Sequence, residues 1–65
     1  MYYIIGIEAV EHYKNHGLTN LGAVIHLTNC YIICDKVKPD HGAEITEEDF
    51  RVLSSIFPGK TKNLE

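Results

Sequence analysis

The sequence predicts a small α+β domain, in which three antiparallel strands form a sheet and one C-terminal helix packs on one face of it. The first observation is a helix start at Thr46, within the segment Ile45-Thr46-Glu47-Glu48-Asp49-Phe50. The second is a series of short runs rich in Ile, Val and Tyr, which are typical of strands. The third is the length of 65 residues, which corresponds to one domain that buries only about 60% of the surface of its unfolded chain.

The first strand is predicted over residues 2–13, because the chain opens with a run of Tyr and Ile. A turn at residues 14–17 would set this strand directly against the next apolar run. The alternative is a βαββα order, in which residues 8–16 form a helix. An acid at its start, basic residues near its end and Gly17 just beyond it suit that helix. The hairpin is the preferred interpretation.

Two further strands are predicted over residues 21–28 and 30–37, with a short turn at Thr28-Asn29 between them. Alternate side chains of a strand point to opposite faces. Both faces of the last strand begin apolar, so one face would meet the helix and the other a second subunit. A homodimer is therefore expected. The two sets of residues are Tyr31, Ile33 and Asp35 on one face, and Cys30, Ile32, Cys34 and Lys36 on the other.

The predicted helix spans residues 46–57. The Thr46 hydroxyl can accept a hydrogen bond from a free amide of the first turn, and Asp49 lies where its side chain can reach back to the cap. Ile45 and Phe50 occupy the two positions of a hydrophobic staple. Apolar residues then recur at spacings of three and four, as a helix face requires: Phe50, Val52, Leu53, Ile56 and Phe57.

Turn residues mark both flanks of this helix. Pro39-Asp40-His41-Gly42 ends the preceding strand, and residues 43–45 are expected to form a brief extended piece. Pro58-Gly59 stops the helix. Residues 1–58 are then the domain and residues 59–65 a flexible tail, whose last two residues, Leu64-Glu65, have the composition of a cloning remnant.

The formal net charge of −3 argues against unaided binding to a phosphate backbone, which needs a positive face. No apolar run is long enough to span a bilayer, so no membrane contact is predicted. The first residues also lack the basic region of a signal peptide. We therefore expect a cytoplasmic protein.

The four histidines and two cysteines are the residues that suit a metal ion such as zinc. His12 and His16 would share a face only if their segment were helical. Cys30 and Cys34 on one strand would lie about 13 Å apart, too far to bind one ion. The main prediction is therefore no metal and no cofactor. The alternative is a metal-stabilised module that binds single-stranded nucleic acid, with His26, Cys30 and Cys34 as ligands beside Lys36 and Lys38.

No segment carries a catalytic signature, and we predict a protein that is not an enzyme. The acidic run from Glu44 to Asp49 is better explained as helix capping than as a carboxylate pair. Gly59-Lys60-Thr61 ends like a phosphate-binding loop, but the upstream glycine is missing and no helix can follow. Buried structural roles are expected for both cysteines, because a reactive thiol needs an electropositive and partly open site.

Two segments carry a resemblance, namely Ile4–Gly17, with Tyr13-Lys14-Asn15 ahead of a glycine, and Gly22–Thr28, with Gly-x-x-Ile-His-Leu. Together they resemble small uncharacterised phage and plasmid proteins that open with a β-hairpin. The resemblance covers less than half of the chain and transfers no functional residue. It implies an origin in a mobile element, and it favours the hairpin over the helix.

The predicted function is that of a small protein-binding module. Such a module would act as a regulator or inhibitor in the host cytoplasm by occupying the surface of a host macromolecule. Surplus aromatic residues would anchor the partner, and an acidic rim would steer a basic partner. The anchors are Tyr2, Tyr3 and Tyr31, and the rim is Glu8, Glu11 and Asp35.

Overall fold

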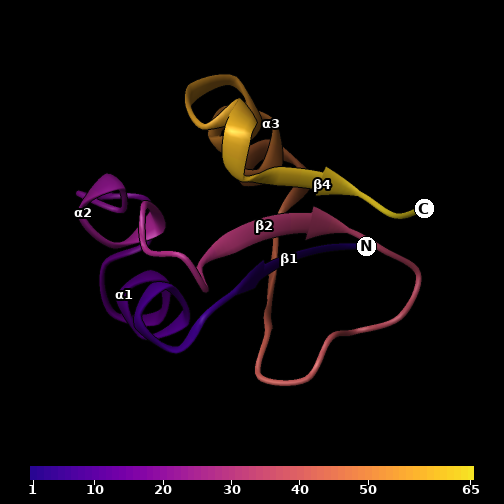
Figure 1. The fold of residues 1–65 in the computed structure, drawn as a ribbon, viewed down its shortest axis with the longest axis horizontal. Coiled ribbons are helices and arrows are strands. Elements are labelled where there is room, and N and C mark those ends of the chain that lie inside the picture. Colours follow the sequence, from indigo (N-terminus) through magenta and orange to yellow (C-terminus); the bar gives the residue numbers. More distant parts are fainter.

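Four short strands form one mixed sheet, with the strand order β3-β1-β2-β4. The computed structural model describes residues 1–65, and Figure 1 shows its helices on two sides of the strands. The elements in chain order are β1 (Tyr2–Ile5), α1 (Ile7–His16), α2 (Gly22–Ile25), β2 (Tyr31–Cys34), β3 (Ala43–Ile45), α3 (Glu47–Ile56), the 3₁₀ turn η1 (Pro58–Lys60) and β4 (Thr61–Asn63).

The core lies on the face of the sheet that α3 covers. Strand β1 is central and pairs antiparallel with both β2 and β3, so that Ile4 stands opposite Ile32 and Ala43. All three are buried. The α+β class is confirmed, but the sheet has four strands rather than three, and β2 and β4 are parallel. The cluster of buried residues is Ile4, Ala9, Leu21, Ile25, Cys30, Ile32, Ala43, Ile45 and Leu53.

The first predicted strand is wrong beyond Ile5, because the chain turns at Gly6 and enters α1. Gly6 has a φ of +107°, a conformation that L side chains rarely adopt. Its carbonyl accepts the first helical hydrogen bond, from the Val10 amide at 2.8 Å. Along α1, Ala9 is buried and Val10 and Tyr13 pack against the core. The βαββα alternative was therefore correct about a helix at residues 8–16.

The second predicted strand, over residues 21–28, is also wrong, because this segment forms the single turn of helix α2. The Ile25 amide donates to the Leu21 carbonyl at 3.0 Å, and both side chains are buried. A spacing of four residues places them on one face of a helix, but it would also place them on one face of a strand, so this spacing alone could not decide between the two. The apolar run resembled a strand because it is rich in β-branched residues.

The third predicted strand is shorter than residues 30–37, since β2 ends at Cys34. The Asp35 carboxylate accepts the backbone N–H groups of Lys36 and Val37, at 2.7 Å and 3.4 Å. This side chain offers the backbone a local partner in place of a neighbouring strand. Asp35 therefore starts the loop of residues 35–42 that leads to β3.

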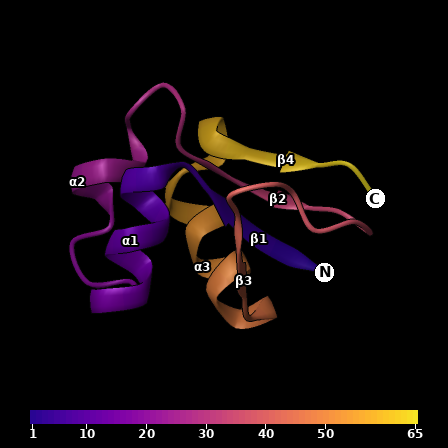
Figure 2. The same ribbon diagram turned by 90° about the horizontal axis from the view of Figure 1, so that it is seen from below.

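The homodimer prediction required an open sheet face opposite α3. In the structure this face is covered. The loop of residues 35–42 passes on this side, away from α3 (Figure 1 and Figure 2). Tyr3, on this face of β1, is only 4% exposed, and Ile33 is buried beside it. The single chain already covers the apolar surface that was expected to meet a second subunit, so this face gives no support to the homodimer, which stays a prediction.

The C-terminal helix is confirmed, with Thr46 as its N-cap. The Thr46 Oγ1 atom accepts a hydrogen bond from the Asp49 amide at 3.0 Å, and Leu53 is buried while Phe50 and Phe57 pack against the core. The Asp49 carboxylate was expected to reach back to the Thr46 cap. It accepts a hydrogen bond from the Tyr13 hydroxyl of α1 instead. The predicted brief extended piece at residues 43–45 is also confirmed, as β3.

The segment predicted as a tail carries η1 and β4. Strand β4 pairs in parallel with β2, with Thr61 opposite Ile32. The Lys60 ammonium donates to the Leu27 carbonyl at 2.8 Å, and the Thr61 hydroxyl to the Phe57 carbonyl at 3.0 Å. The polar composition concealed this strand because it lies at the edge of the sheet, where polar residues are common.

Replacing Gly6 with alanine should strongly destabilise the fold. A Cβ atom there would lie 2.6 Å from Cys30 Sγ and 2.8 Å from the Asn29 carbonyl oxygen, in addition to the strain of a positive φ. We expect Gly6→Ala to lower the free energy of unfolding by about 3 kcal/mol, measured by urea titration.

Two other glycines separate these causes. Gly17→Ala carries the strain of a φ of +61° with open space around the Cβ, and Gly59→Ala has open space and no positive φ. The expected losses are about 1–2 kcal/mol for Gly17→Ala and below about 0.5 kcal/mol for Gly59→Ala. Equal losses at Gly6 and Gly59 would show that the turn from β1 into α1 is not a constraint on the fold.

Candidate binding groove

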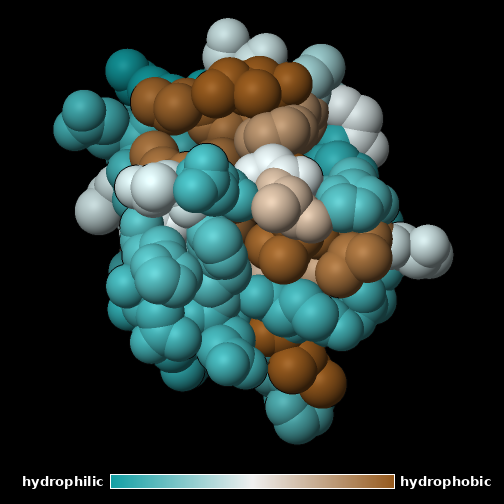
Figure 3. Space-filling view, turned by 90° about the vertical axis from the view of Figure 1, so that its left-hand side faces the viewer, coloured by the Kyte–Doolittle hydropathy of each residue, from teal (hydrophilic) through white to brown (hydrophobic).

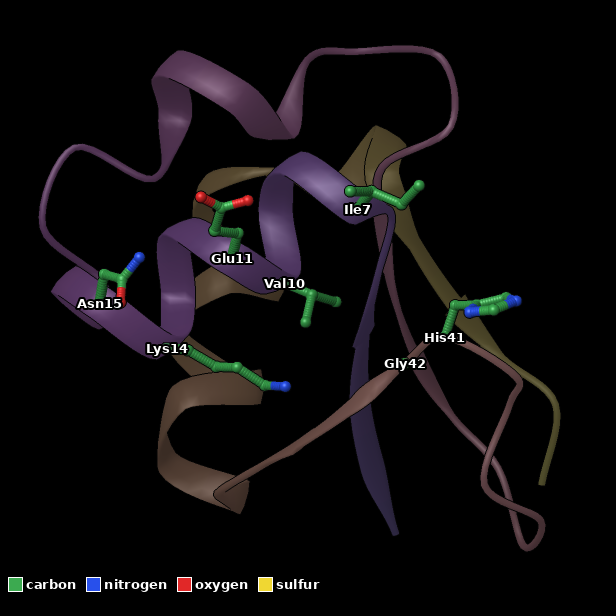
Figure 4. A pocket seen from close by; sticks show the side chains of 7 residues that line it. All are labelled: Ile7, Val10, Glu11, Lys14, Asn15, His41 and Gly42. Carbon is green, nitrogen blue, oxygen red and sulfur yellow. The ribbon is translucent and has the colours of Figure 1, made fainter.

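An open groove of about 390 Å³ lies between α1 and the start of β3. Figure 4 shows the side chains of α1 on one wall and His41 with Gly42 on the other. Ile7 is 70% exposed here, so the groove presents one large apolar side chain to solvent. We name this site the α1–β3 groove, and its lining residues are Ile7, Val10, Glu11, Lys14, Asn15, His41 and Gly42.

The topology leaves one side of β3 unpaired along this groove. Strand β3 is at an edge of the sheet and pairs only with β1. In Figure 4, Val10 and Lys14 point from α1 toward the ribbon of β3. The free N–H and C=O groups of an edge strand can pair with another extended chain. The groove itself holds two apolar side chains among polar ones and ends at His41 and Gly42, and the free edge of β3 begins at the next residue.

The loop wall of the groove has a constrained backbone. His41 has a φ of +60°, which is uncommon for a residue other than glycine. A Cβ atom on Gly42 would lie 2.7 Å from the Pro39 side chain and 3.3 Å from the Ile4 carbonyl oxygen. These two residues therefore hold the wall close to β1, and the imidazole of His41 remains exposed.

A hydrogen bond joins α1, which forms one wall of the groove, to α3. The Tyr13 hydroxyl donates to Asp49 Oδ2 at 2.6 Å and so joins α1 to the first turn of α3. Burial, followed by this hydrogen bond, raises the pKa of Tyr13 to about 12. The bond fixes α1 relative to the β3–α3 segment, on which the width of the groove depends.

The three tyrosines predicted as anchors do not form one surface. Tyr3 is buried on the loop side of the sheet, and its burial raises the pKa of its hydroxyl. Tyr2 packs on Phe50 with ring centroids 4.6 Å apart. Tyr31 is half-buried, and the Lys62 ammonium lies 4.7 Å from the centre of its ring. The contacts of Tyr2 and Tyr31 and the burial of Tyr3 are thus within the chain.

The three predicted rim acids are also divided. Glu8 and Glu11 are exposed on α1, and Glu8 accepts a hydrogen bond from Asn29 Nδ2 at 3.4 Å. Asp35 follows the opposite end of β2 and is occupied by the turn amides. Only Glu11 lines the α1–β3 groove. The acidic rim is therefore not a continuous feature.

The alternative ligand set of His26, Cys30 and Cys34 is not brought together. No three His, Cys, Asp or Glu side chains of the chain are grouped so that they could hold a metal ion. Cys30 is fully buried beside Gly6. Cys34 donates its S–H to Glu65 Oε2 at 3.0 Å, and this hydrogen bond, with burial, raises the pKa of the Cys34 thiol. A raised pKa disfavours the thiolate that a ligand or nucleophile requires.

Most residues of the groove were not among the predicted site residues. Glu11 was the exception, and the others are Ile7, Val10, Lys14, Asn15, His41 and Gly42. The alternative helix at residues 8–16 would have predicted that Ile7, Val10, Lys14 and Asn15 lie together with Glu11. Positions 7, 10, 11, 14 and 15 share one face of a helix. The hairpin interpretation hid this grouping.

No protein-family model matches the chain, and no curated protein or solved structure matches it either. The resemblance to phage and plasmid proteins therefore stays a prediction, although the hairpin that it favoured is absent. No helix in the structure has the length and apolar character needed to cross a membrane.

The Tyr13–Asp49 hydrogen bond should contribute a pH-dependent part of the stability. Tyr13 has a higher pKa in the folded chain than its ordinary value of 10.0. Folding therefore favours the protonated phenol, and this contribution is complete below pH 10 and lost as the pH rises to about 12. We expect Tyr13→Phe to cost about 1 kcal/mol at neutral pH, and the difference from the parent chain to shrink across that window.

Urea unfolding at a series of pH values measures this difference. Asp49→Ala and the double variant complete a mutant cycle, in which Tyr13→Phe should have little further effect once Asp49 is absent. If the two single effects simply add, the hydroxyl and the carboxylate do not stabilise the fold through each other.

Proposed function

We propose that this chain is a non-enzymatic protein-binding module that takes up an extended segment of a partner protein along β3, in the α1–β3 groove. The observation that carries the proposal is the free edge of β3, which begins directly after the groove wall at Gly42, together with the exposed side chain of Ile7 in the same groove. Addition of a strand to a sheet edge is a recurrent mode of peptide recognition, in which main-chain hydrogen bonds supply affinity and side-chain contacts supply specificity.

The size of the edge limits how much the main chain can contribute. Strand β3 has only three residues, Ala43–Ile45, so few hydrogen bonds are available to an added strand. Additional affinity must come from side chains, and the groove that ends at Gly42, just before β3, supplies Ile7 and Val10. Because alternate residues of an added strand face one side, one or two apolar side chains of the partner would lie on these two residues.

The polar residues of the groove would set the orientation of the bound segment. Glu11, Lys14 and His41 surround the apolar contacts, and no hydrogen bond joins any of the three to another. Acid–base catalysis requires such groups within hydrogen-bond reach of each other or of a substrate proton. Separate charges around an apolar centre are instead the usual arrangement of a binding surface.

The other exposed apolar residues of the chain are weaker candidates for a binding site than the α1–β3 groove. Val37, Val52, Ile56 and Leu64 are exposed, but none of them lines a hollow of the surface. Seen from the side of α1 and α2, apolar areas are separated by hydrophilic ones (Figure 3). Scattered apolar residues of this kind are common on protein surfaces. We further propose that the chain is encoded by a mobile element and regulates a host protein by this binding.

Ile7→Glu should weaken the binding of extended peptides while leaving the fold intact, because this side chain is 70% exposed. Peptides would be selected on the parent chain from a random library, and their affinities for each variant measured by calorimetry. We expect a loss of at least about tenfold, which corresponds to one apolar contact of about 1.4 kcal/mol. Backbone amide shifts on binding should be largest at residues 43–45.

Val37→Glu is the matched control, since Val37 is 71% exposed and lies outside the groove. It should keep the affinity of the parent chain. The proposal would fail if the library yielded no peptide that perturbs β3, or if Ile7→Glu and Val37→Glu behaved alike.

A further inference from the structure

Two histidines of α1 lie one helical turn apart and face each other across it. The ring centroids of His12 and His16 are 5.0 Å apart. The pairing exists because residues 7–16 are a helix, in which positions i and i+4 share a face. In the hairpin that the sequence predicted, the two rings would not have been neighbours in this way.

The pair lies in a second hollow of the surface, of about 290 Å³, which we name the histidine hollow. Two carboxylates, those of Glu8 and Glu11, line the same hollow. Four side chains that can bind a divalent cation therefore stand along one side of α1, and two of them carry negative charge. The complete lining is Glu8, Glu11, His12, Asn15, His16 and Val24.

We propose that His12 and His16 form a binding site for a divalent transition-metal ion of the zinc type. Imidazole nitrogens bind Zn²⁺ at about 2.0–2.1 Å, which places the ion about 3.2 Å from each ring centroid. Two centroids 5.0 Å apart then subtend an angle of about 100° at the ion, close to the tetrahedral value that zinc adopts. The two rings need little change in separation to share one ion.

The hydrogen bond of His12 prepares this ring for metal binding. Its Nε2 atom lies 2.5 Å from the Thr19 carbonyl oxygen, and because a carbonyl can only accept, Nε2 carries the proton. In the neutral ring the lone pair is then on Nδ1. Histidines that bind metals commonly donate their other N–H to a carbonyl in this way, which fixes the tautomer and the ring orientation.

The imidazole pair is the whole preformed set, since no third ligand side chain is grouped with it. Water would complete the coordination, and the Glu8 and Glu11 carboxylates of the same hollow would add negative charge around the ion. The site differs from the ligand set predicted from the sequence, because His26, Cys30 and Cys34 take no part.

Zinc chloride titrated into the untagged chain at pH 7.5 tests the proposal, with binding followed by calorimetry and the imidazole nitrogens by NMR. We expect one saturable site, with the resonances of His12 and His16 shifting together. His12→Ala and His16→Ala should each weaken binding by about tenfold or more. His16→Ala is the safer variant, because no hydrogen bond of the fold involves the His16 ring, and circular dichroism would confirm that each variant is folded.

His26→Ala and His41→Ala are the matched controls, since both residues are exposed histidines outside the histidine hollow. They should leave zinc binding unchanged. The proposal is overturned if no saturable binding occurs up to about 1 mM zinc, if folded His16→Ala binds as the parent does, or if the shifted resonances belong to His26, His41 or the cysteines.

Discussion

The turn at Gly6 is the constraint on which the rest of the structure depends. There the chain leaves β1 with a φ of +107° and passes so close to Cys30 that no Cβ atom fits between them. The turn ends the central strand after four residues and sends α1 away from the sheet. Without α1 in this place, neither the groove beside β3 nor the turn that joins His12 to His16 would exist. The backbone conformation of Gly6 thus determines where the two candidate sites on α1 lie.

Local signals predicted the parts of the fold that depend on local chemistry. The cap at Thr46 is a contact three residues along the chain, and the sequence alone located α3 and the extended piece before it. The segment from Glu8 to His16 had equally local helix signals, an acid first and basic residues last, but it was assigned to a strand. The decisive fact was the positive φ of Gly6, at a position where Cys30, 24 positions away, leaves no room for a Cβ atom.

The site could be predicted less well than the fold, because its residues come together through topology. Ile7 and His41 are separated by more than 30 positions and meet only because β3 pairs with β1 rather than with a later strand. Aromatic residues suggested a binding surface, yet Tyr2 and Tyr3 pack inside this chain. In so short a chain, large side chains are needed for the core. Surplus tyrosine is therefore weak evidence for a partner.

The two hollows on α1 are connected through shared residues. Glu11 and Asn15 line both the α1–β3 groove and the histidine hollow, because they occupy the ridge of the helix between its two faces. An ion at His12 and His16 would attract the Glu11 carboxylate and so remove a negative charge from the groove beside Lys14. A bound segment that pairs with Glu11 would in turn draw this carboxylate away from the ion, so each ligand would weaken the binding of the other. Linkage requires that each ligand change the affinity of the other by the same factor, so the two sites of this helix would act as one coupled unit.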